Sequence, residues 1–307
     1  MGFARAFCEI RAWSTNSNRR HEHRLPISIE EMAKAMAANL EAMKPDPQVF
    51  EPPDINNISM VQQIGVRLHG GVISSAHKAL VVLYAGQYSP GSGRCHMSGC
   101  YLVYDASDNS LAAIPQLPDP HTFRGLGRGA AILSLNKGSY VLAELVSSKH
   151  GFPDAELFLW WSPSPNQEGQ WIRRMVPVPP QVLSPGHPFR IDMVFTYDNS
   201  KVCWVDLHKG ALVCNLMESP EPKFTFVPLP EACSIKLEGR CRPRFEEFRT
   251  MGCSCGTIKF VALDGYRERW PLQDIMLKTW TLSPDLKEWE EGTPLPVGDL
   301  WASKSFV

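Results

Sequence analysis

The chain has 307 residues, of which 44% are hydrophobic, and a formal net charge of -1. This near-neutral balance gives no overall attraction to nucleic acid or to an anionic membrane, and the length allows one large β domain or two ordinary ones. No run of about 18 apolar residues occurs, so we expect no membrane-spanning helix. The nine cysteines include no Cys-x-x-Cys pair, and the first residues do not resemble a secretory signal, so we expect free thiols in the cytoplasm or nucleus.

Residues 1–27 are basic and acid-poor, with arginines at positions 5, 11, 19, 20 and 24. We expect a disordered tail here; a mitochondrial transit peptide is the alternative, because such peptides share this composition. Residues 28–58 are expected to form a helix and an irregular connection. Ser28 and Glu31 match a capping box, and apolar residues recur at helical spacing until Lys44, just before Pro45.

From residue 59 the pattern changes to short apolar segments rich in Val, Leu, Phe, Tyr and Trp, separated by polar turns. This pattern is typical of β-strands. We therefore assign residues 59–307 to a single β-repeat domain.

Four stretches of this domain resemble one another. Each carries an aromatic strand, a polar turn and a short strand, and they end at Pro118, Pro179, Pro230 and Pro296. We predict a mainly β, propeller-like repeat of about four four-stranded antiparallel sheets. Four units are few for a closed ring, so an incomplete repeat stays open, and a β-sandwich with a smaller α+β unit is the alternative. The aromatics expected to pack inside this repeat are Tyr104, Trp160, Trp161, Trp204, Trp280 and Trp289.

The C-terminal part carries a family resemblance. The runs VCWVDLHKGALVCNL, FTFVPLPEAC, MGCSCGTIKFVALDG, LKTWTL and WEEGTPLPVGDLW resemble the plant family catalogued as domain of unknown function 1618, which is expanded in grasses. The resemblance is specific over residues 191–306 and weaker over 78–190; more loosely, the repeats are similar to kelch-like and F-box-associated propeller domains. It implies a plant intracellular protein and supplies no catalytic residues. Members usually continue beyond the position of Val307, so a truncated member without independent function is one alternative.

Two motifs raise the question of a bound group. The run Gly125–Gly129 resembles a phosphate loop, but it lacks the third glycine at the required step and no long helix pattern follows it. Cys233, Cys241, Cys253 and Cys255 are candidate zinc ligands, and Cys253 and Cys255 would share one face of a strand. Structural zinc sites usually have two pairs of closely spaced ligands, and the second pair is missing here. We therefore predict neither a cofactor nor a structural metal.

A basic cluster of Arg240, Arg242, Arg244 and Arg249 lies beside Phe245 and Phe248 and is interrupted by two glutamates. Basic and aromatic groups together are typical of RNA-binding sheets, but the interleaved acids favour an ion-paired loop. We expect no nucleic-acid partner.

No constellation typical of a hydrolase or metalloprotease occurs, so we predict no catalytic residues. The leading interpretation is a non-enzymatic module that binds an unknown protein partner through its loops. The candidate loops are 86–98, 119–129, 147–155, 184–188 and 264–274. An enzyme whose site lies on a propeller face is the alternative, since sites can assemble from distant loops.

Overall fold

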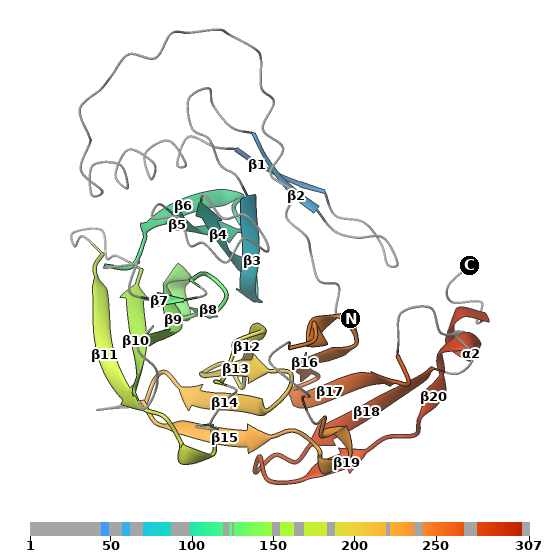
Figure 1. The fold of residues 1–307 in the computed structure, drawn as a ribbon. Coiled ribbons are helices and arrows are strands. Elements are labelled where there is room, and N and C mark those ends of the chain that lie inside the picture. Colours follow the sequence, from blue (N-terminus) through green and yellow to red (C-terminus); the bar gives the residue numbers. More distant parts are fainter. Residues whose placement is uncertain are drawn as a thin grey trace, which may run out of the picture. The chain divides into compact units, whose positions relative to one another are not determined.

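The computed structural model divides the chain into two compact units, Gly2–Met175 and Val176–Val307. The structure describes residues 44–48, 57–61, 70–86, 99–118, 123–124, 126–148, 154–162, 169–182, 188–218, 222–235, 237, 242–266 and 275–302. Most of these residues form antiparallel strands (Figure 1).

The first unit holds two sheets of the repeat. In the β3–β6 sheet the spatial order follows the chain, whereas the β7–β11 sheet has the order β11-β10-β9-β7, with β8 also paired to β9. The strands are β3 (Gly70–His77), β4 (Leu80–Gly86), β5 (Gly99–Asp105), β6 (Ser110–Pro115), β7 (Phe123–Arg124), β8 (Ala130–Ser134), β9 (Tyr140–Ser148), β10 (Asp154–Trp161) and β11 (Trp171–Pro177), with the 3-10 helix η2 (Asn136–Gly138) before β9.

The second unit repeats this plan. The β12–β15 sheet again follows the chain, and the β16–β20 sheet has the order β16-β17-β18-β19, with β20 also paired to β18. Its strands are β12 (Met193–Tyr197), β13 (Lys201–Asp206), β14 (Gly210–Asn215), β15 (Phe224–Pro228), β16 (Arg249–Ser254), β17 (Thr257–Asp264), β18 (Met276–Leu282), β19 (Trp289–Glu291) and β20 (Leu295–Pro296). The short helices are η3 (Pro180–Val182), η4 (Glu231–Cys233), η5 (Phe245–Glu247) and α2 (Val297–Ala302).

Within each unit, the two sheets are joined by the same tryptophan contact. Trp171 on β11 donates its indole N–H to the backbone oxygen of Pro115 at the end of β6, at 2.8 Å. Trp289 on β19 donates in the same way to the backbone oxygen of Pro228 at the end of β15, also at 2.8 Å. Each tryptophan also packs against the apolar core shared by the two sheets of its unit. The equivalence identifies the two units as copies of one two-sheet arrangement.

A second equivalent contact joins β3 to β8 in the first unit and β12 to β16 in the second. Ser75 on β3 accepts a hydrogen bond from the backbone N–H of Ile132 on β8 at 2.9 Å. In the other unit, the sulfur of Met193 on β12 accepts one from the backbone N–H of Met251 on β16 at 3.4 Å. In both contacts, a side chain of one sheet accepts a hydrogen bond from the backbone of the neighbouring sheet.

The predicted fold class is confirmed: the described residues are mainly β and form four antiparallel sheets of four or five strands. One detail of the repeat differs. In the other stretches the leading aromatic belongs to the third strand, but the third stretch begins on the second strand, so Trp204 lies on β13. That stretch therefore contains β13, β14 and β15, whereas the first two stretches contain two strands each. Apart from the argument that places Cys253 on a strand, nothing in the sequence predicts β16, because RTMGCS has neither a clear apolar run nor an alternation.

The region before the repeat differs from its prediction. Lys44, expected in the last turn of a helix, begins strand β1 (Lys44–Gln48), and β2 (Asn57–Val61) pairs with it in antiparallel register. The irregular connection predicted after the helix is therefore wrong. Pro45 and Pro47 lack backbone N–H groups, but they are two residues apart, so both gaps fall on the same side of the strand. The backbone groups of the residues between them can therefore still pair with β2. The rest of the predicted helix and the basic tail lie outside the described residues.

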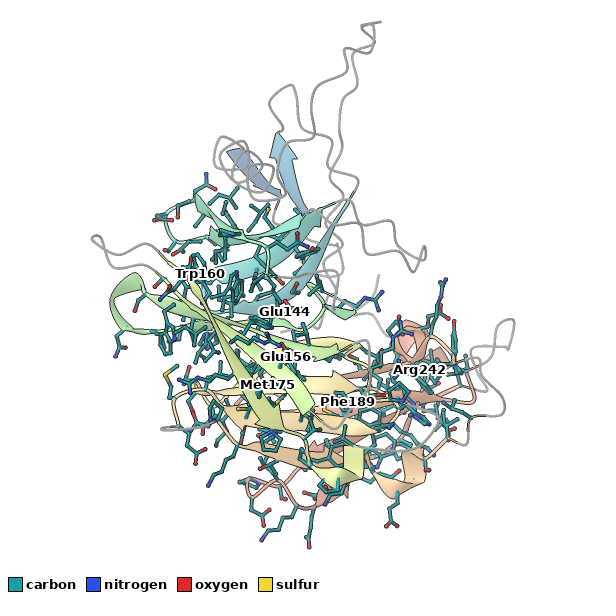
Figure 2. The ribbon with its side chains drawn as sticks, turned by 60° about the vertical axis from the view of Figure 1, so that its left-hand side comes forward. Glu144, Glu156, Trp160, Met175, Phe189 and Arg242 are labelled. Atoms are coloured by element: carbon teal, nitrogen blue, oxygen red, sulfur yellow. The ribbon has the colours of Figure 1, made fainter. Side chains whose placement is uncertain are left out.

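The predicted aromatic residues occupy different environments. Tyr104, Trp160, Trp204 and Trp280 are buried, and Trp289 is half-buried against the core of its unit. Trp161 is 39% exposed, so its assignment to the interior is wrong. Neighbouring strand residues point to opposite faces, and Trp161 is the last residue of β10, where Trp160 takes the inward position (Figure 2). Among the residues the structure describes, no helix has the length and apolar character needed to span a membrane.

Candidate functional site

A buried ion network lies at one end of the β12–β15 sheet. Both terminal nitrogens of Arg242 bind Asp192 at 2.7 Å, and one of them also binds Asp206 at 2.5 Å. The side chains of the two aspartates are each 1% exposed. The backbone N–H of Leu207 donates to Asp192 and that of Arg190 donates to Asp206, so the carboxylates also receive backbone hydrogen bonds.

This network stabilises the connection between β15 and β16. Arg242 belongs to that connection, whereas Asp206 ends β13 and Asp192 precedes β12. Burial raises the pKa of Asp206, and the charge of Arg242 opposes that rise. An arginine held by two carboxylates has its charge matched inside the protein, so the arrangement is suited to fixing a loop.

In the basic cluster predicted around Phe245, the side chain of Arg249 points into the protein. The guanidinium of Arg249 is buried, donates to the backbone oxygens of Leu207 at 3.0 Å and Cys233 at 2.6 Å, and lies 5.2 Å from the ring centre of Phe245. Burial lowers the pKa of Arg249. Phe245 is itself completely buried, so it cannot stack on a nucleic-acid base as an exposed aromatic would.

Only part of that cluster faces solvent. Arg244 is exposed, and its guanidinium is 3.6 Å from the carboxylate of Glu247. Arg242 is ion-paired, as the interleaved-acid interpretation expected, but with Asp192 and Asp206 instead of the neighbouring glutamates. Arg240 lies outside the described residues.

The glycine-rich run is occupied by a carboxylate of the protein itself. The backbone N–H of Gly127 donates to Glu144 on β9 at 2.9 Å, and Glu144 is completely buried. Gly127 has φ of +79°, and the ring of Tyr84 fills the space that a Cβ would need. A glycine is therefore required here for protein packing. Its amide donates to a carboxyl group of the protein itself, in the position where a phosphate loop would bind a ligand.

Glu144 is held in an uncommon protonation state. Burial raises its pKa to about 8, against the opposing effect of the hydrogen bond from the backbone N–H of Gly127. The same burial, together with the charge of Glu144, raises the pKa of Tyr101. A carboxyl group with this pKa exchanges its proton near neutral pH.

The candidate zinc ligands lie in three different environments. Cys233 is buried in η4, Cys253 is half-buried on β16, and Cys255 is exposed. Cys255 and Gly256 form the two-residue turn between β16 and β17, with φ of 51° and 74°. Because Cys255 is in a turn, the argument that it shares a strand face with Cys253 is wrong. Cys241 lies outside the described residues, and within the described ranges no three His, Cys, Asp or Glu side chains group as metal ligands would.

Most of the loops predicted to carry recognition lie outside the described residues. Two of them have described residues that contradict their expected exposure: Ala155 at the end of loop 147–155 is buried, and so are Leu126, Gly127 and Gly129 at the end of loop 119–129. For loop 119–129, the contact with Glu144 explains the difference, since it draws this turn into the core. At the start of loop 264–274, residues 264–266 are exposed.

Sequence analysis missed an exposed apolar strip on the paired strands β10 and β11, which we call the edge strip. It consists of Trp161 and Ile172, which are 39% and 38% exposed and point away from the core that Trp160 and Trp171 contact, whereas Met175, 56% exposed, lies on the same face of β11 as Trp171. Figure 2 shows Met175 on the outermost strand of the sheet that also carries Glu144 and Glu156. The signal in the sequence was the run WIRRMV, which interrupts an apolar strand with two arginines.

By its fold, the chain is an antiparallel β-repeat protein whose sheets are joined in pairs by tryptophan hydrogen bonds. Residues 204–306, about one third of the 307-residue chain, match the model of a family described as "Protein of unknown function (DUF1618)". The resemblance stated for this part of the sequence is thereby confirmed over those residues. Searches of the curated proteins and of the solved structures find no match to this chain.

Proposed function

We propose that this chain is a non-enzymatic protein-interaction module and that its docking surface is the edge strip. The observation that carries the proposal is the exposure of Trp161 and Ile172 on one face of two paired strands. Large apolar side chains left exposed at the edge of a sheet are costly to leave in water and are typical of protein-binding surfaces.

The polar interior supports the same proposal. The ion network of Arg242 and the carboxylate of Glu144 are each bonded to backbone groups or to oppositely charged partners of the same unit. These groups fix loops to sheets and so make a rigid scaffold. All six described cysteines are free thiols, which supports placing the interaction in the cytoplasm or nucleus.

Photo-crosslinking tests this proposal. The photoreactive residue p-benzoylphenylalanine is placed at position 172 or, as a control, at position 225, an exposed position on the equivalent strand β15. In extracts of the native cells, position 172 is expected to yield a discrete crosslinked protein that position 225 does not. The added substitution Trp161→Glu is expected to remove it, because a charge within an apolar contact opposes docking. Identical products from both positions, or none from position 172, would overturn the proposal.

A further inference from the structure

The β16–β20 sheet has one face that differs from the faces of the other sheets. The middle strands β5, β13 and β14 of the other sheets are buried almost throughout, on both faces. On β17, by contrast, buried residues alternate with half-buried or exposed ones, and on β18 only two of the seven residues are buried. Because alternate strand residues point to opposite faces, one face of this sheet is buried and the other is largely open to solvent.

We call the second of these faces the open face. Its side chains come from alternate positions of β17 and β18 and from β19 and β20, and each of them is exposed or half-buried. The cross-strand registers arrange them in three rows. These are Lys259, Thr281 and Glu290 in the first row, Val261 and Thr279 in the second, and Leu263, Leu277 and Leu295 in the third.

The charged row is complementary to itself across strand β18. Lys259 and Glu290 lie on either side of Thr281, which belongs to β18, so opposite charges flank the central strand. In the third row, leucines occupy the central position and both sides of it. A two-fold rotation about an axis parallel to β18 exchanges the two sides of the face. It therefore places a positive side chain over a negative one twice, and leucines over leucines.

We propose that the open face docks on the open face of a second copy of this chain, around a two-fold axis parallel to β18. In this arrangement Lys259 faces Glu290 of the partner subunit, and the two leucine rows meet. Sheets that pack face to face keep their strand directions within about 30° of each other, which such an axis allows. The edge strip belongs to the other unit of the chain, so docking at the open face does not depend on docking at the edge strip.

The composition of the open face suits a reversible contact between folded copies. The buried face of the same sheet carries large apolar side chains such as Phe260, Trp280 and Leu282, whereas the open face mixes leucine and valine with threonine and two charges. Such a mixture of apolar and polar groups is typical of the interfaces of complexes whose subunits also exist apart. The fraction of paired chains should therefore depend on the protein concentration.

Light scattering on the full-length chain tests the inference. Over about two orders of magnitude in protein concentration, the average mass is expected to rise from that of one chain towards that of two. Lys259→Glu and Glu290→Lys each place like charges face to face, and we expect each to weaken association at least about tenfold. Charge reversal is used because an exposed ion pair contributes little by itself. The double variant, which carries both changes, restores opposite charges and is expected to associate like the wild type.

A matched control makes the same change on the other face of the strand. Glu291 follows Glu290 on β19 and is also exposed, but it pairs with Trp280, whose side chain belongs to the buried face. Glu291→Lys therefore reverses a charge one residue away that points to the opposite face. We expect this variant to associate like the wild type.

Each outcome decides for or against this contact. An average mass that stays at that of one chain over the whole range overturns it. A dimer that neither charge reversal weakens, or that the double variant fails to restore, overturns the pairing of Lys259 with Glu290 and with it the two-fold arrangement. Recovery of association in the double variant also shows that the single variants had not lost it through unfolding.

Discussion

The buried carboxyl group of Glu144 should make the stability of the protein fall as pH rises through neutrality. Its pKa is raised from 4.5 to about 8 in the folded chain, so between these values the folded state keeps a proton that the unfolded state has lost. The free energy of unfolding therefore decreases over this range and levels off above it. Each tenfold change in proton affinity corresponds to about 1.4 kcal/mol, so the complete effect is about 5 kcal/mol.

The substitution Glu144→Gln isolates this effect. The amide oxygen can still accept the hydrogen bond from Gly127, but the side chain carries no titrating proton. We expect the variant to be less pH-sensitive than the wild type, with the difference in their free energies of unfolding changing by several kcal/mol between pH 4.5 and pH 9. Urea unfolding followed by tryptophan fluorescence at five pH values measures it.

A surface control separates this effect from a simple change of net charge. Glu290 is exposed on β19, and Glu290→Gln is expected to follow the wild-type pH profile within about 0.5 kcal/mol. If Glu144→Gln and the wild type gave parallel profiles, the desolvation argument for Glu144 would be refuted.

Two further predictions concern the second unit. Arg242→Ala should destabilise it by about 3 kcal/mol or more, because Asp192 and Asp206 stay buried without their counter-charge; the exposed Arg244→Ala should cost less than 1 kcal/mol, and similar urea midpoints for the two variants would contradict this account. Trp289→Phe keeps most of the ring packing but removes the hydrogen bond to the end of β15, so a loss of about 1 kcal/mol is expected, and an unchanged midpoint would show that the bond is not stabilising.

The strands were predictable because their signal is local. Segments such as KVCWVDL and TIKFVAL are rich in β-formers and are bounded by turn residues, which is enough to assign a strand. Strand β16 carries no such signal: its pairing with β17 is set by the Cys255-Gly256 turn, whose backbone conformation allows a two-residue hairpin.

The polar contacts were not predictable, because they join residues far apart in the sequence. Arg242 and Asp192 are 50 positions apart, and nothing near Arg242 marks the aspartate as its partner. Likewise, the run Gly125–Gly129 alone is compatible with a ligand loop, and that interpretation is contradicted by the hydrogen bond from the amide of Gly127 to Glu144, 17 positions away. The exposure of β11 was equally hidden, since adjacent arginines are compatible with either a solvated strand or a loop.

The tryptophan bonds between sheets limit how the repeat can change over evolution. Adding a single residue to β6 or β15 would move the accepting carbonyl by about 3.3 Å along its strand, beyond the reach of an indole that now lies at 2.8 Å. Insertions and deletions should therefore accumulate in the turns, while the ends of these two strands stay in step with the tryptophan of the following sheet.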